Sequence, residues 1–321
     1  MIGSIDTGSA SEGTMLQKFD ERNRDIQVNI NGSLVHRDQA GISPFDSAVQ
    51  GGDAVWEGLR LYRGRIFKLR EHLDRLRDSA LALAFHEIPS HESITREIGR
   101  TLAANGMTDG VHIRLTLTRG VKITSGMDPR LNRGGPTLIV LAERKAPVYD
   151  TGGLSLITSS VRRSPPDCLD PKIHHCNLIQ SILAKIEANA AGADDALMLD
   201  TRGFVAETNA THVFIVRDGA VHTGRTVACP EGITRATVLE LCREHGIPHR
   251  VGDLSLAEVY RAREMFCTGT LGELAAVTKV DGRAIGDGRP GPITGRLSDL
   301  YRDLVASTGE PVGVTPGSGG S

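Results

Sequence analysis

Glycine-containing turn signals divide the apolar segments of this chain into short units. Four such dipeptides stand at the ends of apolar runs: Asn31-Gly32, Arg63-Gly64, Asp218-Gly219 and Asp281-Gly282. Because these dipeptides readily adopt the left-handed backbone of tight turns, the first three predict pairs of neighbouring antiparallel strands, and Asp281-Gly282 predicts a turn after a strand. Strands and helices do not alternate regularly along the chain, so the pattern favours a mixed α+β or α/β fold over a doubly wound parallel sheet.

Hydrophobic periodicity predicts the remaining elements. Helices are expected at 70–84, 177–191 and 234–245. In the second helix the apolar side chains recur at helical spacing and are expected to face the core: Leu178, Ile179, Ile182, Leu183 and Ile186. Strands are expected at 26–30, 34–35, 54–62, 65–68, 112–118, 137–142, 154–159, 196–200, 205–216, 220–223, 265–268 and 275–280.

The chain divides into two predicted domains with a tail at each end. Residues 1–24 and 308–321 are rich in Gly, Ser and Thr and poor in apolar residues, which is typical of flexible tails. The segment 145–153 contains Pro and Gly that break any periodicity, which favours an interdomain linker. A small domain is therefore expected at 25–144 and a larger one at 154–307.

Composition excludes several classes of function. The formal net charge is −2, whereas a general nucleic-acid binder needs an excess of Lys and Arg. No apolar run approaches the roughly 20 residues of a membrane span, and the polar N-terminus lacks the apolar region of a secretory signal. The five cysteines form no CxxC motif, which suits a reducing compartment. A cytoplasmic protein without nucleic-acid or membrane partners is expected.

One lysine stands out as a candidate reactive residue. Lysine is scarce in this chain, and Lys172 alone lies beside a proline in an irregular stretch between a strand and a helix. Such loops often present reactive side chains. Further along, Glu207 interrupts an apolar strand, PEGITR (230–235) begins a helix, and CTGTLGE (267–273) forms a Thr/Gly-rich turn. Helix N-termini and such turns bind phosphate through backbone N–H groups.

This set of residues matches the needs of pyridoxal 5'-phosphate. A lysine amine can bond to the cofactor's aldehyde, a carboxylate can keep the pyridine nitrogen protonated, and the two turns can anchor the phosphate. A zinc hydrolase is a competing interpretation, because four potential ligands lie between 168 and 176: Cys168, His174, His175 and Cys176. Their spacing matches no common zinc site, so no metal is expected. A binding protein without a cofactor is a further alternative.

From about Ser43 to Leu304 the chain resembles the class IV, or fold-type IV, pyridoxal-phosphate aminotransferases. The motifs that carry the resemblance are DAVWEGLRLYRGRIFKLREHLDRLRDSA (53–80), the segment 172–191, ADDALMLDTRGFVAETNATHVFIVRDG (193–219), EGITRATV (231–238) and CTGTLGELAAVTKVDGRAIGDG (267–288). The resemblance implies a small N-terminal α+β domain, a larger barrel-like C-terminal domain with the cofactor between them, and a homodimer.

The resemblance also implies a role for individual residues. Lys172 would form the Schiff base, and Glu207 would pair with the pyridine nitrogen. The remaining cofactor-binding residues would hold the phosphate: Arg70, Ile233, Thr234 and Thr270. Four others would contact the substrate, the two arginines as candidate carboxylate binders: Trp56, Arg114, Arg130 and Leu271.

Branched-chain aminotransferases have the most similar motifs, so the expected reaction is ping-pong transfer of an amino group. The donor would be a small L-amino acid, and the acceptor a 2-oxo acid such as 2-oxoglutarate. The segment Asp128–Asn132 resembles a carboxylate-binding stretch of D-amino-acid aminotransferases, which keeps that activity as an alternative. A lyase resembling aminodeoxychorismate lyase is a second alternative.

Overall fold

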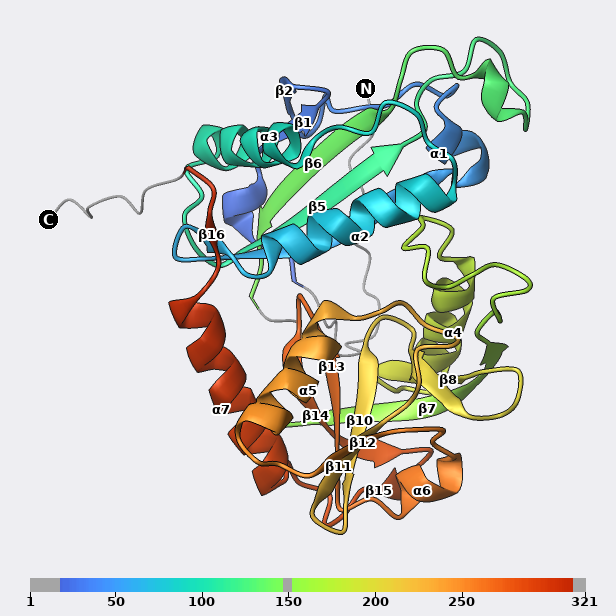
Figure 1. The fold of residues 1–321 in the computed structure, drawn as a ribbon, viewed down its shortest axis with the longest axis vertical. Helices are drawn as coiled ribbons and strands as arrows, with labels where there is room; N and C mark the ends of the chain where they lie inside the picture. Colours follow the sequence, from blue (N-terminus) through green and yellow to red (C-terminus); the bar gives the residue numbers. More distant parts are fainter. Residues whose placement is uncertain (1–17, 147–151, 314–321) are drawn as a thin grey trace, which may run out of the picture.

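The protein, described here from a computed structural model, comprises two domains, each built on its own sheet (Figure 1). The structure describes residues 18–146 and 152–313. Most of the predicted linker 145–153 lies outside these residues, as do most of the N-terminal tail and residues 314–321. Among the described residues, no helix combines the length and the apolar character that a membrane span requires.

The N-terminal domain contains a seven-stranded sheet in the order β16-β4-β3-β5-β6-β1-β2. Its strands are β1 (Gln27–Ile30), β2 (Ser33–His36), β3 (Ala54–Tyr62), β4 (Arg65–Ile66), β5 (Val111–Thr118), β6 (Thr137–Arg144) and β16 (Glu310–Pro311). The helices are α1 (Ser47–Gly51), α2 (Leu69–Ala82) and α3 (His91–Ala104), with the 3-10 turns η1 (Glu21–Asn23) and η2 (Pro129–Leu131). Apolar side chains of α2 and α3 pack with those of the strands into one core.

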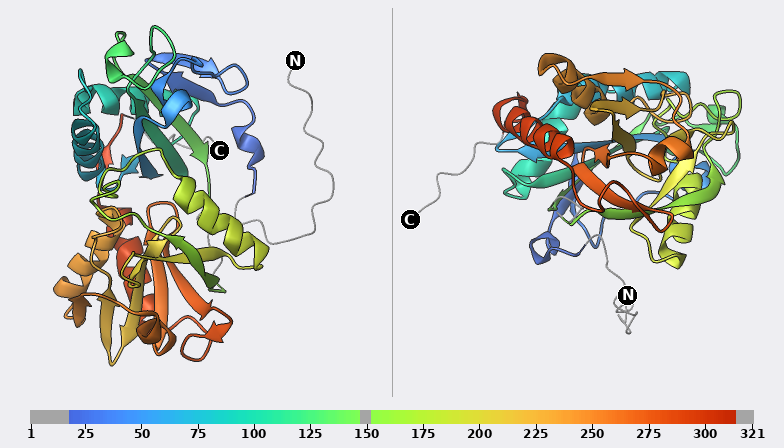
Figure 2. Two further views of the ribbon diagram at one scale, coloured as in Figure 1. Left: turned by 90° about the vertical axis from the view of Figure 1, so that its right-hand side faces the viewer. Right: turned by 90° about the horizontal axis from the view of Figure 1, so that it is seen from below.

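The C-terminal domain contains a nine-stranded sheet that curls on itself (Figure 2). Its strands are β7 (Leu154–Arg162), β8 (Asp195–Leu199), β9 (Val205–Thr208), β10 (His212–Arg217), β11 (Ala220–Thr223), β12 (His249–Val251), β13 (Glu264–Gly269), β14 (Glu273–Val280) and β15 (Arg283–Ala284). Its helices are α4 (Ile179–Ala190), α5 (Ile233–Glu244), α6 (Leu256–Tyr260) and α7 (Pro292–Ser307). Most of its strand pairs are antiparallel, but β7 pairs in parallel with both β8 and β14, and β11 with β12.

Parts of the two predicted tails belong to the folded N-terminal domain. Asn23 is buried, and its side-chain amide exchanges hydrogen bonds of 2.9 and 2.8 Å with the backbone of Arg144. At the other end, the chain leaves α7 and returns to the first sheet, where β16 pairs with β4 (Figure 1). A stretch as short as β16 gives no hydrophobic pattern, and only its pairing with β4 makes it a strand.

The prediction for the buried face of α4 is wrong. Ile179, Ile182, Leu183 and Ile186 are 47–59% exposed, while the buried residues of the helix are Ala184 and Ala188. These alanines pack with Ala196 and Met198 of β8. Small side chains let the helix lie close to the sheet, and the apolar stripe is left on the outer surface.

Candidate active site

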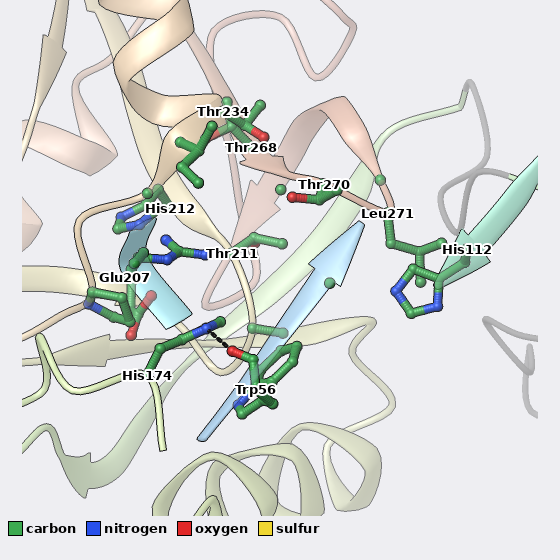
Figure 3. Close-up of a pocket in the computed structure, with 18 of the residues that line it drawn as sticks. Trp56, His112, His174, Glu207, Thr211, His212, Thr234, Thr268, Thr270 and Leu271 are labelled. Carbon is green, nitrogen blue, oxygen red and sulfur yellow. Dashed lines mark hydrogen bonds between the residues drawn. The ribbon is translucent and has the colours of Figure 1, made fainter. Parts of the chain in front are cut away.

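A cavity of about 320 Å³ lies where the two domains meet (Figure 3). The strands β3 and β5 of the first domain line it from one side, and the ends of β9, β10, α5 and β13 line it from the other. Seven predicted site residues line this cavity: Trp56, Arg114, Glu207, Ile233, Thr234, Thr270 and Leu271. Residues from distant parts of the sequence therefore converge on one site.

An anion-binding corner occupies one end of the cavity. Helix α5 begins at Ile233, and no side chain caps its first turn, so the N–H groups of Ile233 and Thr234 are available to a bound anion. Gly232 precedes this turn, and a Cβ atom there would collide with the ring of His212. Thr270 and the Thr268 hydroxyl also face the cavity, and the Thr268 hydroxyl has no hydrogen-bond partner among the described residues. These donors suit a phosphate group.

Arg75 supplies the positive charge of this corner, and the sequence analysis missed it. Its guanidinium binds the Glu57 carboxylate in two places, with Nε–Oε1 and Nη2–Oε2 distances of 2.7 Å, and donates to the Glu231 carbonyl. Glu57 is fully buried in β3. A glutamate inside the apolar run of 54–62 requires a buried cation, and this was the signal that could have identified Arg75.

Arg70 does not reach the cavity, so its predicted role is corrected. The helix α2 turns Arg70 toward solvent, where its backbone N–H binds Glu310 and its side chain lines a different groove, beside α3. Arg75 is five residues further along the same helix, on the side that faces the second domain. Of these two arginines of the motif, Arg75 lines the cavity and Arg70 does not.

Glu207 lies buried at the end of the cavity that His212 and His174 also line (Figure 3). It belongs to β9 and is ion-paired with Arg163, which follows β7. Burial lowers the pKa of the Arg163 guanidinium. The sequence carried no signal for Arg163, because its contact with Glu207 depends on the pairing of β7, β8 and β9. A buried carboxylate at this place can accept a hydrogen bond from a protonated ring nitrogen.

Beside His174, on which Trp56 stacks, the cavity combines a cation with an aromatic ring. The Arg114 guanidinium lies 3.5 Å from the centre of the Trp56 ring, and burial lowers the pKa of Arg114. His112 and Leu271 lie next to each other, on the side of the cavity opposite Glu207 (Figure 3). Burial, with the nearby charges of Lys145 and Arg60, lowers the pKa of His112 to about 3, so the imidazole is neutral. Arg114 is positioned to bind a carboxylate.

Two further predicted residues lie outside the cavity. The Lys172 side chain is 50% exposed, and its Nζ lies 3.3 Å from the Glu231 carboxylate on the surface. Arg130 is 90% exposed and pairs with Asp128 two residues away. Neither lines the cavity of this chain. The side chain that reaches the cavity from the Lys172 segment is that of His174.

The histidines and cysteines of this segment do not support the zinc interpretation. Cys168 is exposed, and His174 hydrogen-bonds Trp56 through Nδ1. In the part of the chain that the structure describes, no three His, Cys, Asp or Glu side chains are grouped so that they could hold a metal ion.

The buried histidine His212 predicts acid sensitivity. Burial, with the charges of Arg235 and Arg75, lowers its pKa to about 3. Below pH 6.5 the unfolded chain therefore takes up a proton that the folded chain does not, and stability falls as the pH falls. We expect His212 alone to lower the free energy of unfolding by about 2 kcal/mol between pH 7 and pH 5. Urea unfolding across this range measures the effect. In His212→Asn the free energy of unfolding should depend less steeply on pH. An unchanged slope would show that His212 does not cause the acid sensitivity.

Comparison with known proteins identifies the family. Residues 54–280 match the family described as "Amino-transferase class IV". The chain belongs to the class IV aminotransferases. Enzymes of this family are transaminases that use pyridoxal phosphate, in agreement with the anion-binding corner and the buried Glu207 carboxylate of this cavity.

Two of the more similar relatives carry names of the branched-chain type, while relatives named D-alanine aminotransferase are 31% identical or less. The chain is 55% identical over 284 residues to "Branched-chain-amino-acid aminotransferase-like protein 2" of Arabidopsis thaliana, covering 88% of this chain and 51% of that protein. It is 39% identical to the "Putative branched-chain-amino-acid aminotransferase" of Methanocaldococcus jannaschii, covering 88% of this chain and 98% of that protein. The chain thus spans about half the length of its Arabidopsis relative.

A solved structure confirms the fold. The branched-chain amino acid aminotransferase of Thermobaculum terrenum, in its PLP holo form, superimposes with a TM-score of 0.79 at 28% identity. The match covers 88% of this chain and 95% of that one. The expected two-domain fold-type IV architecture is therefore confirmed.

Proposed function

We propose that this chain transfers an amino group between a small aliphatic L-amino acid of the branched-chain type and a 2-oxo acid such as 2-oxoglutarate. The observation that carries the proposal is the pairing of two sites in one cavity. An anion-binding corner and a buried carboxylate lie in one part of it, and Arg114 with Trp56 in another. The anion-binding corner and the buried carboxylate suit the cofactor. Arg114 and Trp56 suit the carboxylate of an amino acid beside its apolar side chain.

The cofactor-binding residues follow from this geometry. Ile233, Thr234, Thr270 and Arg75 would hold the phosphate, and Glu207 would hold the pyridine nitrogen. Bound pyridoxal phosphate supplies an aldehyde that accepts the amino group and a ring that withdraws electrons from the substrate's Cα. Because the same group accepts and then donates the amino group, the two substrates would react in ping-pong order.

Substrate binding would rest on Arg114, Trp56 and the loop at Leu271. The Leu271 carbonyl accepts a hydrogen bond of 3.4 Å from Arg60, which ties the loop to β3. Arg130, the residue that suggested a D-amino-acid donor, is exposed and would reach a cavity only in a partner subunit. The L-amino acid is favoured over the D-amino acid alternative because the relatives named for branched-chain amino acids, at 55% and 39% identity, are more similar than those named D-alanine aminotransferase, at 31%.

A single half-reaction tests the proposal. The PLP-loaded chain is mixed with paired L- and D-amino acids without a 2-oxo acid, and the conversion of the cofactor from its aldehyde to its amine form is followed by absorbance. We expect conversion by L-leucine, L-isoleucine or L-valine. Conversion by D-alanine or D-glutamate alone would instead support the D-amino acid enzyme. Release of a 2-oxo acid without conversion would support the lyase, and no reaction at all would refute the proposal.

We further propose that the chain forms a homodimer through the apolar stripe of α4, which consists of Ile179, Ile182, Leu183 and Ile186. These four side chains are about half exposed and lie on one face of the helix. Monomeric proteins rarely expose a contiguous stripe of this kind. A second copy of the chain would cover it.

Charged substitutions in this stripe should dissociate the dimer. In Ile182→Glu/Ile186→Glu, two carboxylates would be buried without partners, so we expect the dissociation constant to rise by about 100-fold or more. Sedimentation velocity measures this change. Leu81→Glu is the matched control, because Leu81 is similarly exposed but lies on α2. Dimers that persist in the double variant, or that are lost equally in the control, would refute the proposed interface.

A further inference from the structure

We infer that this chain holds its cofactor without a covalent bond to any of its own lysines, because His174 occupies the place from which a lysine would have to reach it. The inference rests on the proposed function, since it concerns how the proposed cofactor is retained. The phosphate and pyridine sites of the cavity fit the cofactor, whereas the lysines do not. A covalent link requires an amine at the aldehyde carbon, where a C=N bond forms and water is lost.

Short contacts with β3 fix the segment that carries Lys172. The backbone N–H of Trp56 donates to the His174 carbonyl at 3.0 Å, and that of Cys176 donates to the Ala54 carbonyl at 2.8 Å. The indole N–H of Trp56 donates to the His175 carbonyl at 3.1 Å. Residues 174–176 therefore pair with 54–56 as a short antiparallel bridge. Lys172 lies just outside it, and its backbone N–H binds the Asp170 carboxylate.

The His174 side chain is held as firmly as its backbone. Its ring stacks on Trp56 with centroids 4.3 Å apart, its Nδ1 lies 2.6 Å from the Trp56 carbonyl, and its backbone N–H binds the Ser79 hydroxyl. Because a carbonyl only accepts, Nδ1 carries the proton. Nε2 is then the unprotonated nitrogen of the ring. The cavity thus receives a neutral imidazole from this segment.

Lys172 cannot replace His174 without a rearrangement of the segment. A shift of two residues would be needed, and it would break the backbone pairing with β3 together with the contacts of His174 to Trp56 and Ser79. It would also separate the Lys172 ammonium from the Glu231 carboxylate and bring it into a corner that already contains Arg75.

Lys145 is the one lysine among the described residues that lines the cavity, and it lies near His112, away from Glu207 and His212. Its Nζ is 3.3 Å from the Glu143 carboxylate, and its charge acts on His112. Figure 3 places His112 across the cavity from Glu207 and His212. The remaining described lysines, Lys18, Lys68, Lys122, Lys185 and Lys279, do not line it.

Reductive trapping tests the inference. The full-length chain is loaded with one equivalent of pyridoxal phosphate, and quenching of the fluorescence of Trp56, the single tryptophan, reports binding. Borohydride then reduces any C=N bond to a stable C–N bond, and peptide mass spectrometry locates the adduct. We expect less than about a tenth of the chains to carry an adduct at Lys172 or Lys145, and the cofactor to be lost on desalting. A stoichiometric adduct at either lysine would overturn the inference.

Two variants sharpen the test. Lys172→Gln should bind the cofactor within about twofold of the natural chain. In the double variant His174→Lys/Lys172→Gln the new amine would lie beside Glu57, whose Oε1 is 3.2 Å from the His174 ring, and we expect a stoichiometric adduct at position 174. No adduct there would overturn the placement of His174 at the aldehyde. Absent quenching in the natural chain would refute the proposed function itself, whereas quenching with an adduct at Lys172 would overturn only this inference.

Discussion

Replacing Glu57 with alanine should lower the free energy of unfolding by about 3–5 kcal/mol, because it removes a fully buried carboxylate and leaves the partly buried guanidinium of Arg75 without its counter-ion. Glu57 is fully buried and accepts hydrogen bonds from both Nε and Nη2 of Arg75. Its other neighbours are His72, at 2.6 Å, and His174. Burial alone would raise the pKa of Glu57, but Arg75 and the two histidines lower it well below the usual value.

Urea unfolding followed by circular dichroism measures this loss. Glu71→Ala is the matched control, because Glu71 lies on α2 and pairs with Lys68 at the surface, where an ion pair contributes about 1 kcal/mol or less. Equal effects of the two substitutions would show that the Glu57–Arg75 pair does not stabilise the site. Because Arg75 also belongs to the anion-binding corner, Glu57→Ala should weaken phosphate binding as well.

Replacing Glu207 with glutamine should slow amino-group transfer by about 10²–10³-fold, a loss comparable to removal of a preorganised charge partner in other active sites. Glutamine keeps the shape of the side chain but cannot stabilise a protonated pyridine nitrogen. The phosphate-binding residues remain intact, so cofactor affinity should change far less than the rate.

Single-turnover kinetics with the amino acid that converts the cofactor fastest measure the effect of Glu207→Gln. Glu244→Gln, an exposed change at the end of α5, serves as the control and should leave the rate unchanged. A rate within threefold of the natural chain in Glu207→Gln would contradict the assigned role.

The sequence predicted which segments meet at the site better than it predicted which side chains face it. Turn signals and helix starts identified the segments around Trp56, Glu207, Thr234 and Thr270, and all four residues line the cavity. These segments have local signatures, such as a glycine before the first turn of α5. Resemblance to the family added their relative order in the chain.

Side-chain direction within a segment depends on long-range contacts, which the sequence does not show. Lys172 was favoured as the scarce lysine in an irregular loop, but pairing of 174–176 with β3 turns His174 inward. On α2, Arg70 and Arg75 carry the same charge, and only the packing of the helix separates them. The apolar stripe of α4 has helical spacing, yet Ala184 and Ala188 face the sheet because they allow close approach.

Two long helices, in addition to the five-residue helices α1 and α6, escaped prediction for similar reasons. The hydrophobic pattern predicted no element at α3 or α7, which carry many polar residues between their apolar ones. Each becomes recognisable once its partner is known. Ile94, Ile98 and Leu102 of α3 join the core of the first domain, and Leu297 and Tyr301 of α7 join that of the second.

The measurement that tests the central claim most directly is a fluorescence titration of the full chain with pyridoxal phosphate, compared with pyridoxal, which lacks the phosphate. Trp56 is the single tryptophan and lines the cavity, so its emission reports this site. If the cavity is the cofactor site, pyridoxal phosphate should quench saturably at one equivalent per chain, and pyridoxal should bind at least about tenfold more weakly, since the anion-binding corner contributes to affinity. Absence of saturable quenching, or equal affinity for the two compounds, would contradict the account.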